Sequence, residues 1–316
     1  MNTDTELLIR RRELVAIGLD DGLLRRSLRA GDLAQVVTGA YAKRAEWEVL
    51  KPIEQHRMRV LATSERLRTE VVYSHHAAAA LWGIQLLGRW PQLVDVTLER
   101  ASGGRSDGAL RRHCTGLETT RVTQLHGLTI TTPAQTIIDL ARMLPFADGV
   151  AAADSALHRK RRPAPLVTRD ELFEVLALAE GKRGFRKAAR ATEFATDLSD
   201  SVEESNSRVQ IHLLGFPEPE LQRAFVIPSG ATFETDFYFR EVDHIGECDG
   251  RAKYTDPLFL NGRTPQEAVI DEKNRENELR RLVRGFSRWE PRELYPPRRL
   301  YDRLTRDGVP TTKRRP

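Results

Sequence analysis

Cysteine is scarce in this sequence, with only Cys114 and Cys248 among 316 residues. The two cysteines lie far apart and do not have the spacing of metal ligands, so the sequence predicts neither a disulfide framework nor a zinc site. This scarcity is compatible with a reducing compartment, and we therefore expect a cytoplasmic protein.

Long apolar runs are also missing from the chain. No stretch of about 18 consecutive apolar residues occurs, which is the length that a membrane-spanning helix needs. The first residues, MNTDTELLIRRRELV, contain no uninterrupted apolar core of the kind found in secretory leaders. We expect neither secretion nor insertion into a membrane.

Charge of one sign is not in large excess either. The 50 basic and 45 acidic residues give a net charge of +5 and a pI near 9.3. This balance is compatible with DNA as a partner, but affinity for phosphate has to come from local basic patches. The glycine-rich stretch SGGRSDG, residues 102 to 108, does not match any phosphate-cradling spacing.

The chain contains alternating helical and strand-like periods, which predict a mixed α/β (α+β) fold class. Its length predicts two or three domains. The expected organisation is a winged-helix-like domain, a mixed α/β domain, a third domain with a mixed sheet flanked by helices, and a basic tail, over residues 1–50, 51–162, 163–300 and 301–316. We expect the final TTKRRP to be disordered.

The first 45 residues predict a helix, a turn, a second helix and a hairpin around Thr38-Gly39. In the second helix the leucines face inward, which leaves Arg25, Arg26 and Arg29 as candidate DNA contacts. The alternative is an ordinary solvated helix face. Residues 1 to 50 hold eight basic and eight acidic residues, which weakens the DNA interpretation.

Two adjacent histidines, His75 and His76, open a predicted helix in the central region and are candidate metal ligands. Neighbouring residues on a helix point about 100° apart and seldom share one ion. Polar residues of a first helical turn are therefore the favoured interpretation. The run HRKRRPAP, residues 158 to 165, predicts a basic linker.

The stretches TFETDFYF and HIGECD predict two strands of a hairpin joined through REVD. A loop centred between residues 241 and 242 places residues whose numbers sum to 483 opposite each other. Asp236 then faces Glu247, and Glu234 faces Asp249. Four carboxylates on one face repel each other, and a divalent cation would reverse that repulsion. The pattern indicates a site for Mg²⁺, or Mn²⁺, for phosphodiester hydrolysis.

Such a site also needs a basic group near the reacting phosphate. Lys253, four residues after Asp249, and Lys273, on the following predicted helix, are the candidates. Glu204 is a further candidate acid on a helix that starts at Ser201. The spacing of Ser201 and Glu204 equally predicts a helix-capping pair without any catalytic role.

The ordered motifs ESNSR, GFPEPELQ, TDFYF, GECDGRAKY, EKNRENELR and RWEPREL resemble a known family over about residues 198 to 295. They are similar to actinobacterial domain-of-unknown-function proteins placed among the restriction-endonuclease-like, PD-(D/E)xK or very-short-patch-repair-like nucleases. The resemblance implies that Asp236 and Glu247 are the two motif acids and that Glu204 is the acid of the preceding helix. It also implies a lysine two residues after the second acid, where this chain has Asp249.

The N-terminal segment RRRELVAIGLDDGLLRRSLRAGDLAQVVTGAYA resembles the winged-helix part of AbiEi-type antitoxins and transcriptional regulators. This resemblance implies DNA and a cognate toxin protein as partners.

Three functions follow from these observations. The first is a DNA-associated, Mg²⁺-dependent endodeoxyribonuclease in which Asp236, Glu247 and Asp249 bind the metal. The second is a DNA-binding regulator or antitoxin with an inactive nuclease fold. The third is an interaction module whose acids are bridged by arginines such as Arg251 or Arg275.

Overall fold

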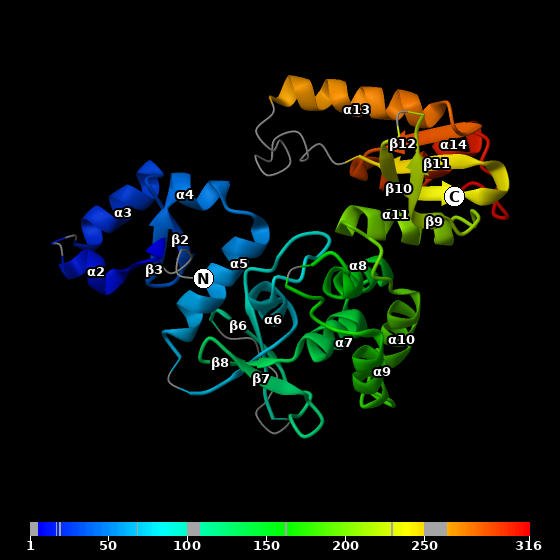
Figure 1. Ribbon diagram of the computed structural model, residues 1–316. Coiled ribbons are helices and arrows are strands. Elements are labelled where there is room, and N and C mark those ends of the chain that lie inside the picture. The colour runs from blue at the N-terminus through cyan, green and yellow to red at the C-terminus, as the bar shows by residue number, and fades with distance from the viewer. Residues whose placement is uncertain are drawn as a thin grey trace. The chain divides into compact units, whose positions relative to one another are not determined.

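The structure is a computed structural model that describes residues 6–16, 18, 20–67, 69–99, 108–161, 163–228, 230–249 and 264–316 (Figure 1). Helices and mixed or antiparallel sheets alternate along the chain, which confirms the α+β fold class. The chain forms two compact units: unit 1 is Met1–Leu144 with Leu166–Glu193, and unit 2 is Pro145–Pro165 with Phe194–Pro316. The domain boundaries expected from the sequence stay predictions, since compactness groups elements without defining domains.

The N-terminal part of unit 1 has the predicted helix, turn, helix and hairpin. Asp20 caps the second helix by accepting a hydrogen bond from the backbone N–H of Leu23, and Gly31 ends it in the left-handed conformation that glycine allows. The sheet order is β1-β3-β2. The elements are β1 (Ile9–Arg10), α2 (Arg11–Ala16), α3 (Asp21–Ala30), β2 (Leu33–Val37), β3 (Ala40–Lys43) and α4 (Arg44–Val49).

The rest of unit 1 is built on a five-stranded mixed sheet of order β6-β5-β4-β8-β7. Buried aliphatic side chains of β5 and β8 pack with α5 and α6 around Val60, Ala77 and Ile130. The elements are α5 (Pro52–Ser64), β4 (Val72–Tyr73), α6 (His75–Trp82), β5 (Val94–Thr97), β6 (Leu110–His113), β7 (Val122–Leu125), β8 (Leu128–Thr131), α7 (Pro133–Met143), α9 (Arg169–Ala177) and α10 (Phe185–Phe194).

Unit 2 is built on a four-stranded sheet of order β12-β11-β10-β9, antiparallel except for the parallel pair β11 and β12. The predicted hairpin register is confirmed, because Phe237 pairs with Gly246 and Phe239 with His244. The elements are α8 (Phe146–Leu157), α11 (Val202–Leu213), β9 (Glu220–Val226), β10 (Thr232–Phe239), β11 (His244–Cys248), α13 (Pro265–Arg280), β12 (Gly285–Trp289) and α14 (Arg298–Arg306), with short 3-10 turns η2 (Arg240–Val242) and η4 (Pro291–Leu294).

Helices cover both faces of this sheet, as the sequence predicts (Figure 1). On one face Phe237 and Trp289 pack against residues of α11, η4 and α14. On the other face Ile245 packs against Leu279 of α13. Strand β9 was not predicted, because its sequence ELQRAFV has no strong apolar alternation.

The C-terminal residues 311 to 313 are bound to the end of α11, so the expected disorder there is wrong. Thr311 donates its hydroxyl to the carbonyl of Leu214, and the backbone N–H of Thr312 donates to Gly215. Lys313 donates its Nζ to the carbonyl of Leu213 at 2.9 Å. The ammonium group of Lys313 thus provides a hydrogen-bond donor for a carbonyl at the C-terminal end of α11, which has no partner within the helix.

No helix within the described ranges has both the length and the apolar character needed to cross a bilayer.

Candidate functional site

Of the predicted acids of the hairpin, Glu234 and Asp236 lie on β10, Glu247 lies on β11 and Asp249 directly follows it, but they have different partners. Asp236 accepts a hydrogen bond from the backbone N–H of Cys248 at 2.8 Å. Glu234 instead contacts the Nζ of Lys160, also at 2.8 Å. The expected group of four carboxylates on one face is therefore divided, although the register that predicted it is right.

Glu247 is the buried centre of the site, with 5% of its surface exposed. Arg275 of α13 donates its Nη2 to both carboxylate oxygens, at 2.8 and 2.7 Å, and Arg288 of β12 donates to Oε2 at 2.9 Å. Arg288 lies directly beside Glu247 because the two residues are partners in the parallel pair of β11 and β12. The acid of the predicted metal site is thus neutralised by two arginines.

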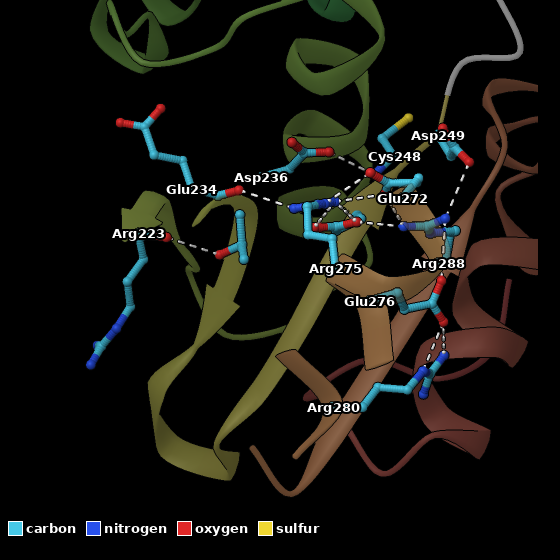
Figure 2. Close-up of polar contacts among 12 residues, drawn as sticks. Arg223, Glu234, Asp236, Cys248, Asp249, Glu272, Arg275, Glu276, Arg280 and Arg288 are labelled. Atoms are coloured by element: carbon cyan, nitrogen blue, oxygen red, sulfur yellow. Dashed lines mark hydrogen bonds and ion pairs between the residues drawn. The ribbon is translucent and has the colours of Figure 1, made fainter. Parts of the chain in front are cut away.

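Further acids complete this arrangement around the same two arginines. Glu272 accepts from Arg275 at 2.9 and 2.8 Å and from Arg288 at 2.6 Å. Arg288 also approaches Glu276 at 3.2 Å and Asp249 at 3.5 Å. We call the set of Glu247, Asp249, Glu272, Arg275, Glu276 and Arg288 the arginine-carboxylate network (Figure 2).

The contacts of the network favour the charged forms of Arg275 and Glu272. Burial acts to lower the pKa of Arg275, but the hydrogen bond to Glu272 and the charge of Glu247 outweigh it and raise that pKa. Burial likewise acts to raise the pKa of Glu272, while Arg275 and then Arg288 hold it below its ordinary value. Charged hydrogen bonds of this kind are among the stronger ones in proteins, and each fixes the geometry of its partner.

The three candidate metal ligands do not fit Mg²⁺ or Mn²⁺ in this arrangement. A hard cation needs carboxylate oxygens that point to one centre. Both oxygens of Glu247 accept from arginine, Asp249 faces Arg288, and Asp236 accepts from a backbone N–H. Within the described part of the chain, no group of three or more His, Cys, Asp or Glu side chains has a metal-binding arrangement.

Glu204 is part of the cap of α11, which was the structural alternative for this residue. Ser201 donates its hydroxyl to Oε1 of Glu204 at 2.9 Å, and the backbone N–H of Glu204 donates back to Ser201 at 3.1 Å. The other oxygen accepts from the backbone N–H of Asp200 and from the amide of Gln222. These contacts occupy both carboxylate oxygens and give Glu204 a role in folding.

Neither candidate lysine belongs to the site as described. Lys273 is exposed, because the face of α13 that turns to the sheet carries Glu272, Arg275 and Leu279. Lys253 lies outside the described residues, as does Arg251 of the third interpretation. The cations next to Glu247 are Arg275, which that interpretation named, and Arg288, which the sequence analysis missed. Arg288 could have been found only by predicting its parallel strand beside β11.

The three arginines of α3 are all exposed, as predicted. Leu24 is buried in the small core of this part of unit 1, and Leu28 packs against it. Arg25 donates its Nε to the carbonyl of Asp21 at 3.1 Å, one turn earlier on the helix. Helix α3 therefore has a basic outer face, and its contact with DNA stays a prediction.

No protein-family model matches the chain. Two Mycobacterium tuberculosis proteins, Uncharacterized protein Rv2248 and Uncharacterized protein MT2308, are each 31% identical to it over 140 residues. The match covers 44% of this chain and spans half the length of these curated relatives. Among solved structures, that of the RV2827C protein from Mycobacterium tuberculosis is similar over 65% of this chain and 76% of its own, with 15% identity and a TM-score of 0.35.

Proposed function

We propose that this chain is a DNA-binding regulator whose restriction-endonuclease-like part does not cut DNA and serves as an interaction module with arginine-bridged acids. The observation that supports the second half of the proposal is the double pairing of Glu247 with Arg275 and Arg288. Moving an arginine away from Glu247 would leave a buried carboxylate without a partner, which is strongly unfavourable. A metal ion therefore does not readily displace the arginines. The position where the family resemblance implies a lysine holds Asp249.

The DNA-binding half of the proposal rests on α3. It is the second helix of a helix-turn-helix, the element that enters the major groove in proteins with this motif. Arg26 and Arg29 are exposed on it and have no carboxylate partner among the described residues. Arginines in such a position contact phosphates or base edges. The proposal places the protein in the cytoplasm and, from the antitoxin resemblance, includes a cognate toxin as a second partner.

The test is a titration of a labelled DNA duplex with the full chain, followed by fluorescence anisotropy over a series of salt concentrations. The double variant Arg26→Ala/Arg29→Ala should bind more weakly, and its slope of log K against log salt should be shallower by about 2, one for each lost phosphate contact. The matched control is Arg89→Ala, which removes an exposed arginine from a loop of the same unit. Binding should be unchanged by EDTA. Equal slopes for the double variant and the control would contradict the role of α3.

The metal-dependent endodeoxyribonuclease remains a second candidate, favoured by the confirmed hairpin register that sets Asp236 and Glu247 on adjacent strands. Plasmid cleavage with Mg²⁺ or Mn²⁺, combined with calorimetric titration of the same metals, separates it from the regulator. The regulator shows neither cleavage nor saturable metal binding. Cleavage by the wild type that disappears in Asp236→Asn and in Glu247→Gln, with DNA binding retained, would establish the nuclease.

A further inference from the structure

Unit 1 contains a second polar centre, which the proposed function does not use. Asp95 of β5 is fully buried, and it contacts Nδ1 of His76 at 3.0 Å and Nε2 of His113 at 2.7 Å. Burial acts to raise the pKa of Asp95, but these two histidines hold it well below its ordinary value. His113 in turn stacks on His75, with 3.8 Å between the ring centroids. Asp95 therefore holds the imidazole rings of His76 and His113 in place by hydrogen bonds.

His75 is held in an unusual conformation at the start of α6. Its φ is +48°, in the left-handed region that residues with a side chain rarely adopt. The side chain is 6% exposed, and its Nδ1 is 2.9 Å from the hydroxyl of Ser74. Its Nε2 has no hydrogen-bond partner among the described residues. Such strained positions persist where the surroundings fix them, and they are frequent at binding and active sites.

The ring of His75 lines a cavity of about 890 Å³ that lies wholly within unit 1. His113, Asp139 and Arg142 form the wall beside it, and residues 181 to 187 form a second wall that packs against Arg142. This second wall is anchored, because Arg142 donates its Nε to the carbonyl of Arg183 at 2.9 Å. A Cβ at Gly184 would lie 2.4 Å from the carbonyl oxygen of Arg142, so only glycine permits this close approach.

The cavity is strongly basic. Arg142 and four side chains of the second wall contribute positive charge, whereas Asp139 is the one carboxylate that lines it within the described residues. The four are Lys182, Arg183, Arg186 and Lys187. Of these, Arg183, Arg186 and Lys187 have no carboxylate partner in the part of the chain that the structure describes.

This combination identifies the chemical class of the ligand. Unpaired arginines and lysines in a concave site attract anions, and the planar guanidinium matches the oxygens of a phosphate. The volume lies in the range of about 300–1,000 Å³ that small-molecule pockets occupy, which exceeds the size of a single phosphate ion. We propose that the cavity binds a phosphate-bearing ligand of nucleotide size, with the phosphate at Arg183, Arg186 and Lys187 and the remainder against His75, while Arg142 stays paired with Asp139 at 3.4 Å.

The proposal is tested by calorimetric titration of the full chain with AMP, adenosine, pyrophosphate and a single-stranded hexanucleotide. AMP should bind once per chain, and adenosine, which lacks the phosphate, at least about tenfold more weakly. Arg186→Ala/Lys187→Ala should weaken AMP binding by about tenfold or more. The control Arg190→Ala lies one turn further along α10, outside the cavity wall, and should change little.

A variant that is expected to strengthen AMP binding distinguishes lost phosphate recognition from a simple folding defect. Asp139→Asn removes the carboxylate of the cavity and should tighten AMP binding, which a destabilised protein would not do. Stronger binding of the hexanucleotide than of AMP, with the same loss in the double variant, would support phosphate recognition and assign the phosphate to nucleic acid. Equal binding of adenosine and AMP, or no saturable binding of any probe by the wild type, would overturn the proposal.

Discussion

Both units pair their buried carboxylates, but only unit 1 combines such a pair with a cluster of exposed cations that lack carboxylate partners among the described residues. In unit 2, Glu247 is surrounded by arginines that are themselves shared with Glu272, so positive and negative groups satisfy one another. In unit 1, Asp95 is matched by histidines, but the basic walls of the adjacent cavity are opposed by Asp139 alone among its lining residues. Matched charges hold a structure together, whereas unmatched ones are available to a ligand. Ligand binding is therefore expected in unit 1, whereas substitutions in the network of unit 2 are expected to lower the free energy of unfolding.

The largest effect is expected where the matched group is fully buried. Asp95→Ala removes the acceptor shared by His76, which is buried, and His113, which is partly buried, and also removes the carboxylate 3.7 Å from Arg111. We expect a loss of about 3–5 kcal/mol in the free energy of unfolding, measured by urea titration with tryptophan fluorescence. Glu99→Ala, an exposed change just after the same strand, should stay within about 0.5 kcal/mol. Equal losses in the two variants would show that the histidine pairing contributes nothing.

The next effect concerns the carboxylate of the cavity. Burial raises the pKa of Asp139 to about 6, despite the opposing hydrogen bond of Gln135 and charge of Arg142. Between about pH 4 and pH 6 the unfolded chain has released this proton while the folded chain retains it. Stability therefore falls as pH rises through that window and is level above it, with a total of up to about 3 kcal/mol.

Asp139→Asn should remove this fall. Urea unfolding of both proteins at several pH values between 4 and 7 measures it, because the difference in unfolding free energy between variant and wild type should change only across the window. Two curves that run parallel throughout would mean that Asp139 titrates normally in the folded state.

A smaller effect is expected in the arginine-carboxylate network, because its arginines are about one-fifth exposed. A double-mutant cycle of Glu247→Gln and Arg288→Met should give a coupling energy of about 1–2 kcal/mol, after allowance for solvent screening. The two single variants and the double variant are compared with the wild type by urea unfolding. Additive losses would show that the pair, although well aligned, does not stabilise the sheet.

The smallest effect is expected at Lys273, which is exposed on the outer face of α13. Lys273→Ala should change stability by less than about 0.5 kcal/mol and should leave DNA binding unaltered. The same variant would abolish cleavage if this lysine assisted a nuclease reaction. Unfolding and plasmid assays on one preparation therefore distinguish a surface lysine from a catalytic one.

Local features of the fold were accessible from the sequence. The hairpin register followed from strict alternation and a short loop, and the pair of Phe237 with Gly246 confirms it. The capping pair of Ser201 and Glu204 likewise depends on residues only three positions apart, and it forms. Short sequence separations limit the number of arrangements, so patterns of a few residues are sufficient to specify them.

The site depends on pairings that are distant in sequence, and of the two arginines that bind Glu247 the sequence analysis named Arg275 as a possible partner but missed Arg288. Arg288 is 41 residues from Glu247 and reaches it only because β12 pairs in parallel with β11. His75 and His76 were interpreted as ordinary polar residues of a first turn, because nothing local reveals Asp95 behind them. Whether a charged group is a ligand site or a structural pair is decided by its partner, and the partner comes from another element.

Each of the two units is formed by two separate segments of the chain, and this has a consequence for its synthesis. Residues 145 to 165 belong to unit 2, yet residues 166 to 193 return to unit 1. During translation unit 1 cannot be complete until residue 193 has left the ribosome, by which time part of unit 2 has already emerged. No single cut in the chain, by a protease or by recombination of the gene, leaves both units whole. A single break in the chain therefore separates residues that belong to the same unit in at least one of the two units.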